Sequence, residues 1–155
     1  MYEKILVPLD GSELAECVLP HVENIVRGGG VREVVFFRVA EPALVSSRYA
    51  EIGLTEADVK RIAAESEAAA RKYLDELVGR VNYAKVNMRS EVVTGRAADS
   101  LADFAAKNEV DLIIIATHGR SGLGRLVLGS VTDSVVRRSH LPCLVVHPNE
   151  QAASS

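Results

Sequence analysis

Short apolar runs alternate along this chain with longer segments in which apolar residues recur every three or four positions. The runs Lys4–Leu9, Glu33–Val39, Val86–Val93, Leu112–Ala116 and Pro142–His147 predict five strands. The helical spacing predicts four helices: one from a Ser12 cap to about Arg27, then Glu56–Gly79, Ala97–Lys107 and Ser130–Ser139. Pro20 falls inside the first helix and predicts a kink or a lost backbone hydrogen bond near Glu16.

The regular alternation of strands and helices indicates an α/β fold. We expect a single doubly wound five-stranded parallel sheet with helices on both faces, formed by residues 1–148 as one domain. Residues 149–155 are polar and are expected to form a disordered tail. The connection Glu41–Thr55 shows no strong period, and connections of that length tend to be functional or mobile.

A glycine-rich loop feeds the last predicted helix and points to an anion site. Gly119, Gly122, Gly124 and Gly129 lie between the fourth strand and that helix together with Ser121, and Ser130 begins the helix. Such a loop presents backbone N–H groups and the positive end of a helix dipole, so it can hold a phosphate. Arg120 and Arg125 lie in the loop and would add charge, or are solvated surface residues.

Two polar residues beside this loop are open to two interpretations each. Ser130 either donates a hydroxyl to the anion or is a plain helix N-cap. Asp10, at the end of the first strand, either accepts a hydrogen bond from a sugar hydroxyl or a base amino group, or closes its own Asp-Gly turn.

Ligands of such sheets bind beyond the carboxyl ends of the strands where the strand order reverses. With the order 3-2-1-4-5, Asp10 and the Ala116–Gly119 segment flank that point.

Composition excludes several other classes of protein. The chain has 155 residues, 48% of them hydrophobic, and 18 basic against 21 acidic side chains, so no positive field would recruit nucleic acid or an anionic membrane. No apolar stretch is long enough for a membrane span, and no signal peptide is evident, so a cytoplasmic location is expected. Two cysteines and four scattered histidines show no metal-ligand spacing.

Three segments resemble landmarks of the universal stress protein family, and the resemblance covers essentially the whole chain. They are KILVPLDGSELAE, VVFFRVAE and IIIATHGRSGLGRLVLGSVTDSVVRRSHLPCLVV. The nucleotide-binding branch of the family has the motif G-x2-G-x9-G-[ST]. This sequence aligns with it as Ala116-x2-Gly119-x9-Gly129-Ser130, which departs from the motif only at its first position.

The resemblance implies the sheet order 3-2-1-4-5, a homodimer, and ATP as a regulatory ligand in the stress response, with Mg²⁺ as a counter-ion of the nucleotide. Pro8, Asp10 and Val39 would surround the adenine and its sugar. The residues that would line the ribose and phosphates are Ala116, Gly119, Arg120, Gly129, Ser130 and Val131. His118, which either contacts the ligand or fills the loop, completes the candidate site together with Gly122 and Thr132.

Other functions with related folds lack an essential part here. The chain has no HxGH element of nucleotidyl transferases, no Gly-Lys-Ser/Thr of P-loop enzymes, no aspartate at the end of strand three and no phosphate loop after strand one. A nucleotide switch with at most slow hydrolysis is therefore the main hypothesis. The alternative is a dimeric interaction module that binds no nucleotide, which the departure at Ala116 supports.

The last predicted strand suggests how two chains assemble. Leu141–His147 should lie at the edge of the sheet, and its apolar residues Leu144, Val145 and Val146 are unsuited to contact with water. We therefore expect a two-fold dimer that covers this strand. The sequence does not indicate the protein partner.

Overall fold

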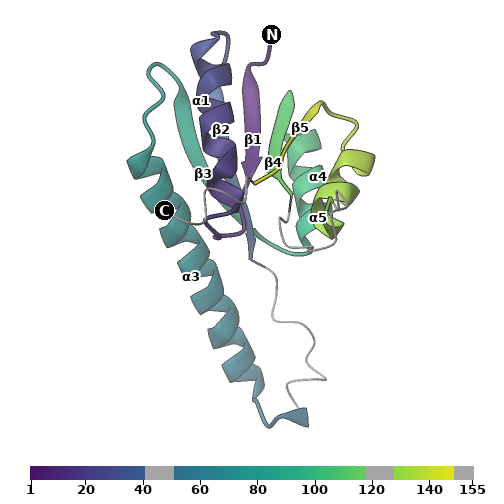
Figure 1. Ribbon diagram of the computed structural model, residues 1–155. Helices are drawn as coiled ribbons and strands as arrows, with labels where there is room; N and C mark the ends of the chain where they lie inside the picture. The colour runs from purple at the N-terminus through teal and green to yellow at the C-terminus, as the bar shows by residue number, and fades with distance from the viewer. Residues whose placement is uncertain (41–50, 118–127, 149–155) are drawn as a thin grey trace.

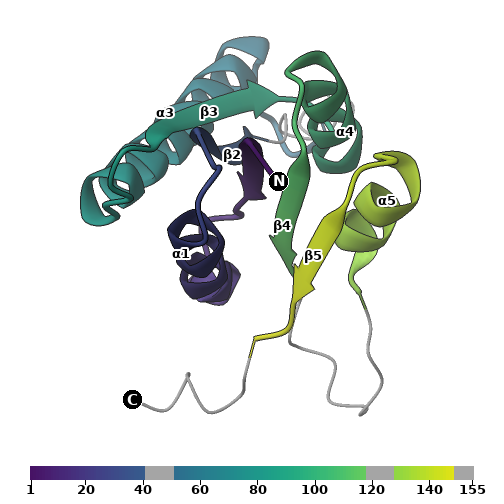
Figure 2. The ribbon, with the colours of Figure 1, turned by 90° about the horizontal axis from the view of Figure 1, so that it is seen from above.

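The computed structural model describes residues 1–40, 51–117 and 128–148. Five parallel strands form one sheet in the order β3-β2-β1-β4-β5, as expected from the sequence. The strands are β1 (Lys4–Pro8), β2 (Glu33–Ala40), β3 (Asn87–Thr94), β4 (Leu112–Ala116) and β5 (Cys143–Val146). The bounds of β4 match the predicted ones, and those of the other strands differ by one residue at one or both ends. Figures 1 and 2 show the sheet between two pairs of helices.

The helices cover both faces of the sheet. On one face lie α1 (Leu19–Arg27) and α3 (Glu56–Arg80), and on the other lie α4 (Ala97–Lys107) and α5 (Ser130–Arg138) (Figure 2). The inner strands are buried on both sides, because Ile5 and Phe36 pack towards α1 and α3 whereas Leu6 and Phe37 pack towards α4 and α5. This explains why their sequences are continuous apolar runs.

The first predicted helix is wrong in its first half. The chain forms a short 3-10 helix, η1 (Ala15–Val18), and α1 begins only at Leu19, with Pro20 in its first turn. Proline fits there because the first N–H groups of a helix have no intrahelical partner, so no kink arises from a lost bond. Ser12 is not the N-cap of either helix, because η1 is preceded by Leu14 and α1 by Val18 without a side-chain cap. The Oγ of Ser12 instead accepts a hydrogen bond from the N–H of Ala15 at 3.2 Å.

The helix α3 is anchored by only one of its halves. Its buried residues Ala70, Leu74 and Leu77 all lie in the C-terminal half, which packs on β2 and β3. The N-terminal half projects past the carboxyl ends of the strands (Figure 1). Thr55 and Asp58 form a capping box at its start, and Thr55 Oγ1 accepts from the N–H of Asp58 at 3.2 Å.

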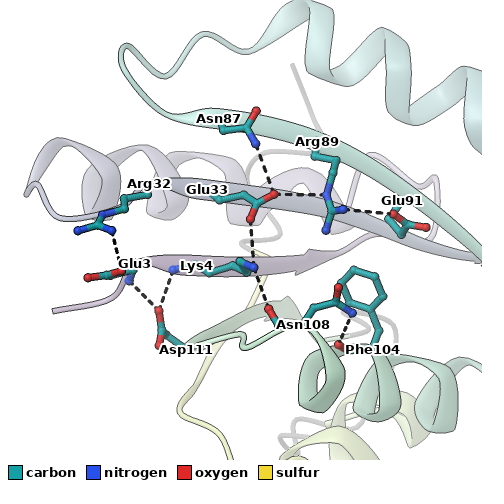
Figure 3. A network of polar contacts seen from close by, with 10 residues as sticks. All are labelled: Glu3, Lys4, Arg32, Glu33, Asn87, Arg89, Glu91, Phe104, Asn108 and Asp111. Atoms are coloured by element: carbon teal, nitrogen blue, oxygen red, sulfur yellow. Dashed lines mark hydrogen bonds and ion pairs between the residues drawn. The ribbon is translucent and has the colours of Figure 1, made fainter.

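Polar contacts tie the strands together at their amino ends (Figure 3). The carboxylate of Glu33 in β2 lies 3.2 Å from Nζ of Lys4 in β1 and 3.3 Å from Nε of Arg89 in β3. Asp111, just before β4, accepts hydrogen bonds from the backbone N–H groups of Glu3 and Lys4, both at 2.8 Å. Four adjacent strands are therefore held in register at the end opposite the site described below.

Candidate functional site

A cavity of about 280 Å³ opens at the carboxyl ends of the central strands. It lies where the order of the strands reverses, between β1 and β4, which is the position that ligands take in doubly wound sheets. Its walls come from the ends of β1, β2 and β4, the segment after β1, and the first turns of α4 and α5. The lining residues are Pro8, Leu9, Asp10, Ser12, Leu14, Ala15, Phe37, Arg38, Val39, Ala97, Leu101, Ile115, Ala116, Thr117, Val131 and Thr132.

The turn after β1 brings a carboxylate to this cavity. Asp10 Oδ1 accepts hydrogen bonds from the backbone N–H of Ser12 at 2.8 Å and from its hydroxyl at 2.6 Å. Gly11 has a φ of +86°, a conformation that glycine adopts without steric cost. The structural interpretation of Asp10 is thereby confirmed. Its exposed position on the cavity wall leaves the ligand-binding interpretation open as well.

Two buried threonines shape the wall at the end of β4. Thr117 and Thr132 are only 4% and 3% exposed, so their hydroxyls need partners inside the protein. Thr132 Oγ1 donates to the carbonyl oxygen of Ala116 at 3.1 Å, and Thr117 Oγ1 contacts Nδ1 of His147 beyond β5. These contacts fix the start of α5 and the end of β5 to the strand that lines the cavity.

The N-terminus of α5 borders the cavity. Gly129 is the N-cap, with φ +70° and ψ 152°, and Ser130 is the first residue of the helix. The alternative that Ser130 is a plain N-cap is therefore wrong: the capping position is occupied by Gly129, and no side chain caps this end. Ser130 is exposed, and its hydroxyl lies at the helix end where the dipole favours an anion.

A second hollow of about 330 Å³ also borders this helix end. Ala97 and Val131 line both hollows, so the two share a border. The second one also contains Arg96 at the start of α4, and Arg138, which forms an ion pair with Asp99. Together the two hollows extend from the turn after β1, past the first turns of α4 and α5, to Arg138 at the end of α5.

The two hollows bring together many of the site residues that were predicted from the sequence. Six of them line the first cavity: Pro8, Asp10, Val39, Ala116, Val131 and Thr132. Ser130 lines the second hollow, and Gly129 precedes it. The predictions for His118, Gly119, Arg120 and Gly122 concern residues outside the described ones, as do those for Gly124 and Arg125.

Sequence reasoning missed Arg38, a charged residue that lines the cavity from β2. Its guanidinium carbon lies 5.3 Å from the centroid of the Tyr73 ring in α3. Burial, followed by the hydrogen bond to Glu16, raises the pKa of Tyr73 above its ordinary value. The sequence did contain a signal for Arg38: it is a charged residue inside the apolar run Phe36-Phe37-Arg38-Val39. A cation in such a strand needs a partner, which makes it a candidate for a specific role.

Within the described ranges, no three His, Cys, Asp or Glu side chains come together in a way that would bind a metal ion. The same part of the chain has no helix that combines the length and apolarity needed to span a membrane.

Comparisons with known proteins agree on one family. The model of the universal stress protein family matches residues 1–147. Universal stress protein MJ0531 of Methanocaldococcus jannaschii is 32% identical over 148 residues, which cover 94% of this chain and 82% of that protein.

Two solved structures share the fold over nearly their whole length. The structure of the protein MJ0577, from the same organism, has a TM-score of 0.78 at 26% identity and covers 97% of this chain and 99% of its own. A universal stress protein family protein from Arabidopsis thaliana, solved with AMP bound, has a TM-score of 0.66 at 16% identity, with 99% and 96% covered. With the family match over residues 1–147, these findings establish that the chain belongs to the universal stress protein family.

Proposed function

We propose that this protein binds ATP in the cavity at the carboxyl ends of β1, β2 and β4 and acts as a dimeric, nucleotide-dependent regulator in the stress response. The observation that carries the proposal is the position of the cavity: it joins the Asp10 turn on one side to the N-terminus of α5 on the other. A nucleotide has matching ends, since its sugar and base carry hydrogen-bonding groups and its phosphates carry negative charge.

The proposed orientation follows from the chemistry of the two ends. The nucleoside occupies the first cavity beside Pro8, Asp10 and Val39, where apolar walls meet one carboxylate. The phosphates lie at Gly129, Ser130 and Val131, and the helix dipole favours them there. A volume of about 280 Å³ is at the small end of the range of ligand pockets, roughly 300–1,000 Å³. The adjoining second hollow supplies the additional room for phosphates.

A relative of the same fold supports an adenine nucleotide. The Arabidopsis protein was solved with AMP bound. That likeness is one of fold, so the assignment to this chain rests on the cavity and on the Gly119-x9-Gly129-Ser130 part of the motif. Mg²⁺ would accompany ATP as a counter-ion held mainly by the phosphates and water.

The residues at the phosphate end favour a switch over a fast enzyme. Rapid hydrolysis needs a group that positions water and a charge that neutralises the γ-phosphate. The nearest acid in α5, Asp133, is paired with Arg137 at 3.0 Å, and no P-loop lysine precedes Ser130. We expect steady-state hydrolysis slower than about 1 per second, below the usual range of enzymes.

The second candidate, an interaction module without nucleotide, is favoured by Ala116 alone. Its methyl group stands on the cavity wall where the motif has glycine. Alanine is the smallest departure from glycine, so we expect Ala116→Gly to bind ATP as well as the parent protein or better. If the parent protein binds no ATP and Ala116→Gly does, the interaction module is the native function.

The deciding experiment measures bound nucleotide directly. Protein purified without added nucleotide is treated with acid, the released ligand is identified by mass spectrometry, and ATP binding is then measured by calorimetry. Asp10→Ala should weaken ATP binding by about 1–3 kcal/mol, the cost of an unmade ligand hydrogen bond. Asp103→Ala, which removes an exposed acid on α4, is the matched control and should bind like the parent. Absence of ATP binding in the parent would refute the proposal.

A further inference from the structure

Arg38 supports the turn that carries Asp10. A β carbon placed on Gly11 would lie 2.8 Å from Nη1, 2.9 Å from Cζ and 3.0 Å from Nη2 of Arg38. Three such similar distances put the broad face of the guanidinium against the α carbon of Gly11. The positive φ is the reason for glycine at position 11, and the Arg38 guanidinium occupies the space that a side chain there would take.

Tyr73 in α3 holds the guanidinium in this place. The ring centroid lies 5.3 Å from Cζ of Arg38, a distance at which a cation is attracted to an aromatic face. The ring itself is fixed at its other end, because its hydroxyl donates to Oε1 of Glu16 at 2.9 Å. Arg80 donates to both carboxylate oxygens of Glu16, at 3.1 and 3.2 Å.

The same ring therefore reaches the Asp10–Glu16 segment at two points. Arg38 connects it to Gly11, and the hydroxyl connects it to Glu16 in η1. An exposed turn that contains glycine samples many conformations unless something holds it, and a ligand that needs one conformation must order it on binding.

We propose that Arg38 is a positioning residue for the nucleotide: stacked on Tyr73, its guanidinium holds the turn of residues 10–12 in the shape that presents the Asp10 carboxylate to the ligand. The ligand in this inference is that of the proposed function, whereas the support of the turn is a property of the protein alone. A consequence is that the affinity for nucleotide depends on a residue of α3 that does not line the cavity.

The test compares mobility of the turn with affinity. Backbone 15N order parameters at Gly11 and Ser12 should be near 0.85 in the free parent protein and fall below about 0.6 in Arg38→Ala and in Tyr73→Leu. ATP affinity should fall about tenfold in both variants. Tyr73→Phe keeps the stacking ring but loses the hydrogen bond to Glu16, so its turn should stay more rigid than that of Tyr73→Leu. Arg38→Lys should not replace arginine, because lysine lacks the flat stacking surface.

Controls separate this role from others. Arg71→Ala removes an equal charge from α3, at a residue paired with Glu67, and should change neither quantity. If affinity falls in Arg38→Ala while the turn stays rigid, Arg38 contacts the ligand directly and the positioning role is refuted. A rigid turn with unchanged affinity refutes it too. If the parent binds no ATP, the order parameters still decide the support of the turn, so the two proposals fail separately. Thermal unfolding identifies any variant that does not fold, and Tyr73→Leu provides a second route.

Discussion

The hydroxyl of Thr132, in the first turn of α5, donates a hydrogen bond to the carbonyl oxygen of Ala116, at the last residue of β4. The threonine is buried, and its bond joins the helix end proposed to bind phosphate to the strand residue at which the chain departs from the family motif. The geometry of the phosphate end therefore depends on the end of β4.

Thr132→Val tests this link. Valine keeps the shape of the side chain but leaves the carbonyl of Ala116 without its partner, so the free energy of unfolding should fall by about 1–3 kcal/mol. ATP affinity should fall as well, since α5 is no longer fixed to β4. Thr132→Ser retains the hydroxyl and serves as the control. Urea unfolding and calorimetry measure the two effects, and equal stability of the valine and serine variants would contradict the link.

Gly129→Val should weaken ATP binding by on the order of 1–3 kcal/mol. The φ of +70° and ψ of 152° at Gly129 belong to a region that is essentially restricted to glycine, so a side chain would distort the N-terminus of α5. Gly79→Ala is the contrasting change: nothing lies within 4 Å of the added carbon in α3, and it should stabilise the fold by about 0.5–1 kcal/mol. An unchanged affinity in Gly129→Val would show that the phosphates lie elsewhere.

Asp111 should make the fold sensitive to acid. Hydrogen bonds from the backbone N–H groups of Lys4 and Glu3 lower the pKa of this carboxyl below its ordinary value. Its contribution is therefore present above about pH 4, the unfolded pKa, and is lost as the pH falls through the lower folded pKa. Asp111→Asn should be less stable than the parent at pH 7, by about 1 kcal/mol because the carboxylate is largely solvated. Urea unfolding should give the same stability for both proteins once the pH is below the folded pKa.

The edge strand β5 should form the dimer interface. Within Cys143–Val146 there is no charged residue, whereas the opposite edge, β3, carries Arg89 and Glu91. Charged residues protect an exposed edge from pairing, so β5 is the unprotected one. Light scattering at micromolar concentration should give twice the chain mass of 16.7 kDa. Val145→Lys should give the monomer, and Ile52→Lys, at a residue that is 70% exposed elsewhere, should remain a dimer. A monomeric parent would count against the interface.

Periodicity predicted the elements well where they are buried on a regular face, as the exact bounds of Ala97–Lys107 and Leu112–Ala116 show. It failed between Ser12 and Leu19, because Leu14, Cys17 and Val18 have a spacing that a 3-10 turn and an α-helix both satisfy. The Thr55-x-x-Asp58 pair was a further signal in the sequence, and it marks the start of α3 to the residue.

The part of the candidate site that lies at the ends of strands could be predicted from the sequence. Asp10 and Ala116 follow from the rule that ligands bind at the carboxyl ends of adjacent strands. The role of Arg38 could not be predicted from this rule, because it depends on contacts with Gly11 and Tyr73. Those residues are distant from Arg38 in the sequence and belong to different parts of the fold. The family resemblance was correct, and the identity of the ligand remains the proposal that calorimetry tests.

The ion pairs and hydrogen bonds around Glu33 and Asp111 all lie at the amino ends of the strands (Figure 3), and the cavity lies at the other end. These ties align the strands at one rim of the sheet, and the proposed ligand site lies at the opposite rim. Mutations at the carboxyl rim can alter the ligand without loosening the ties that align the strands. Such a separation lets relatives diverge in what they recognise while they keep one architecture, which accords with a shared fold at 26% identity.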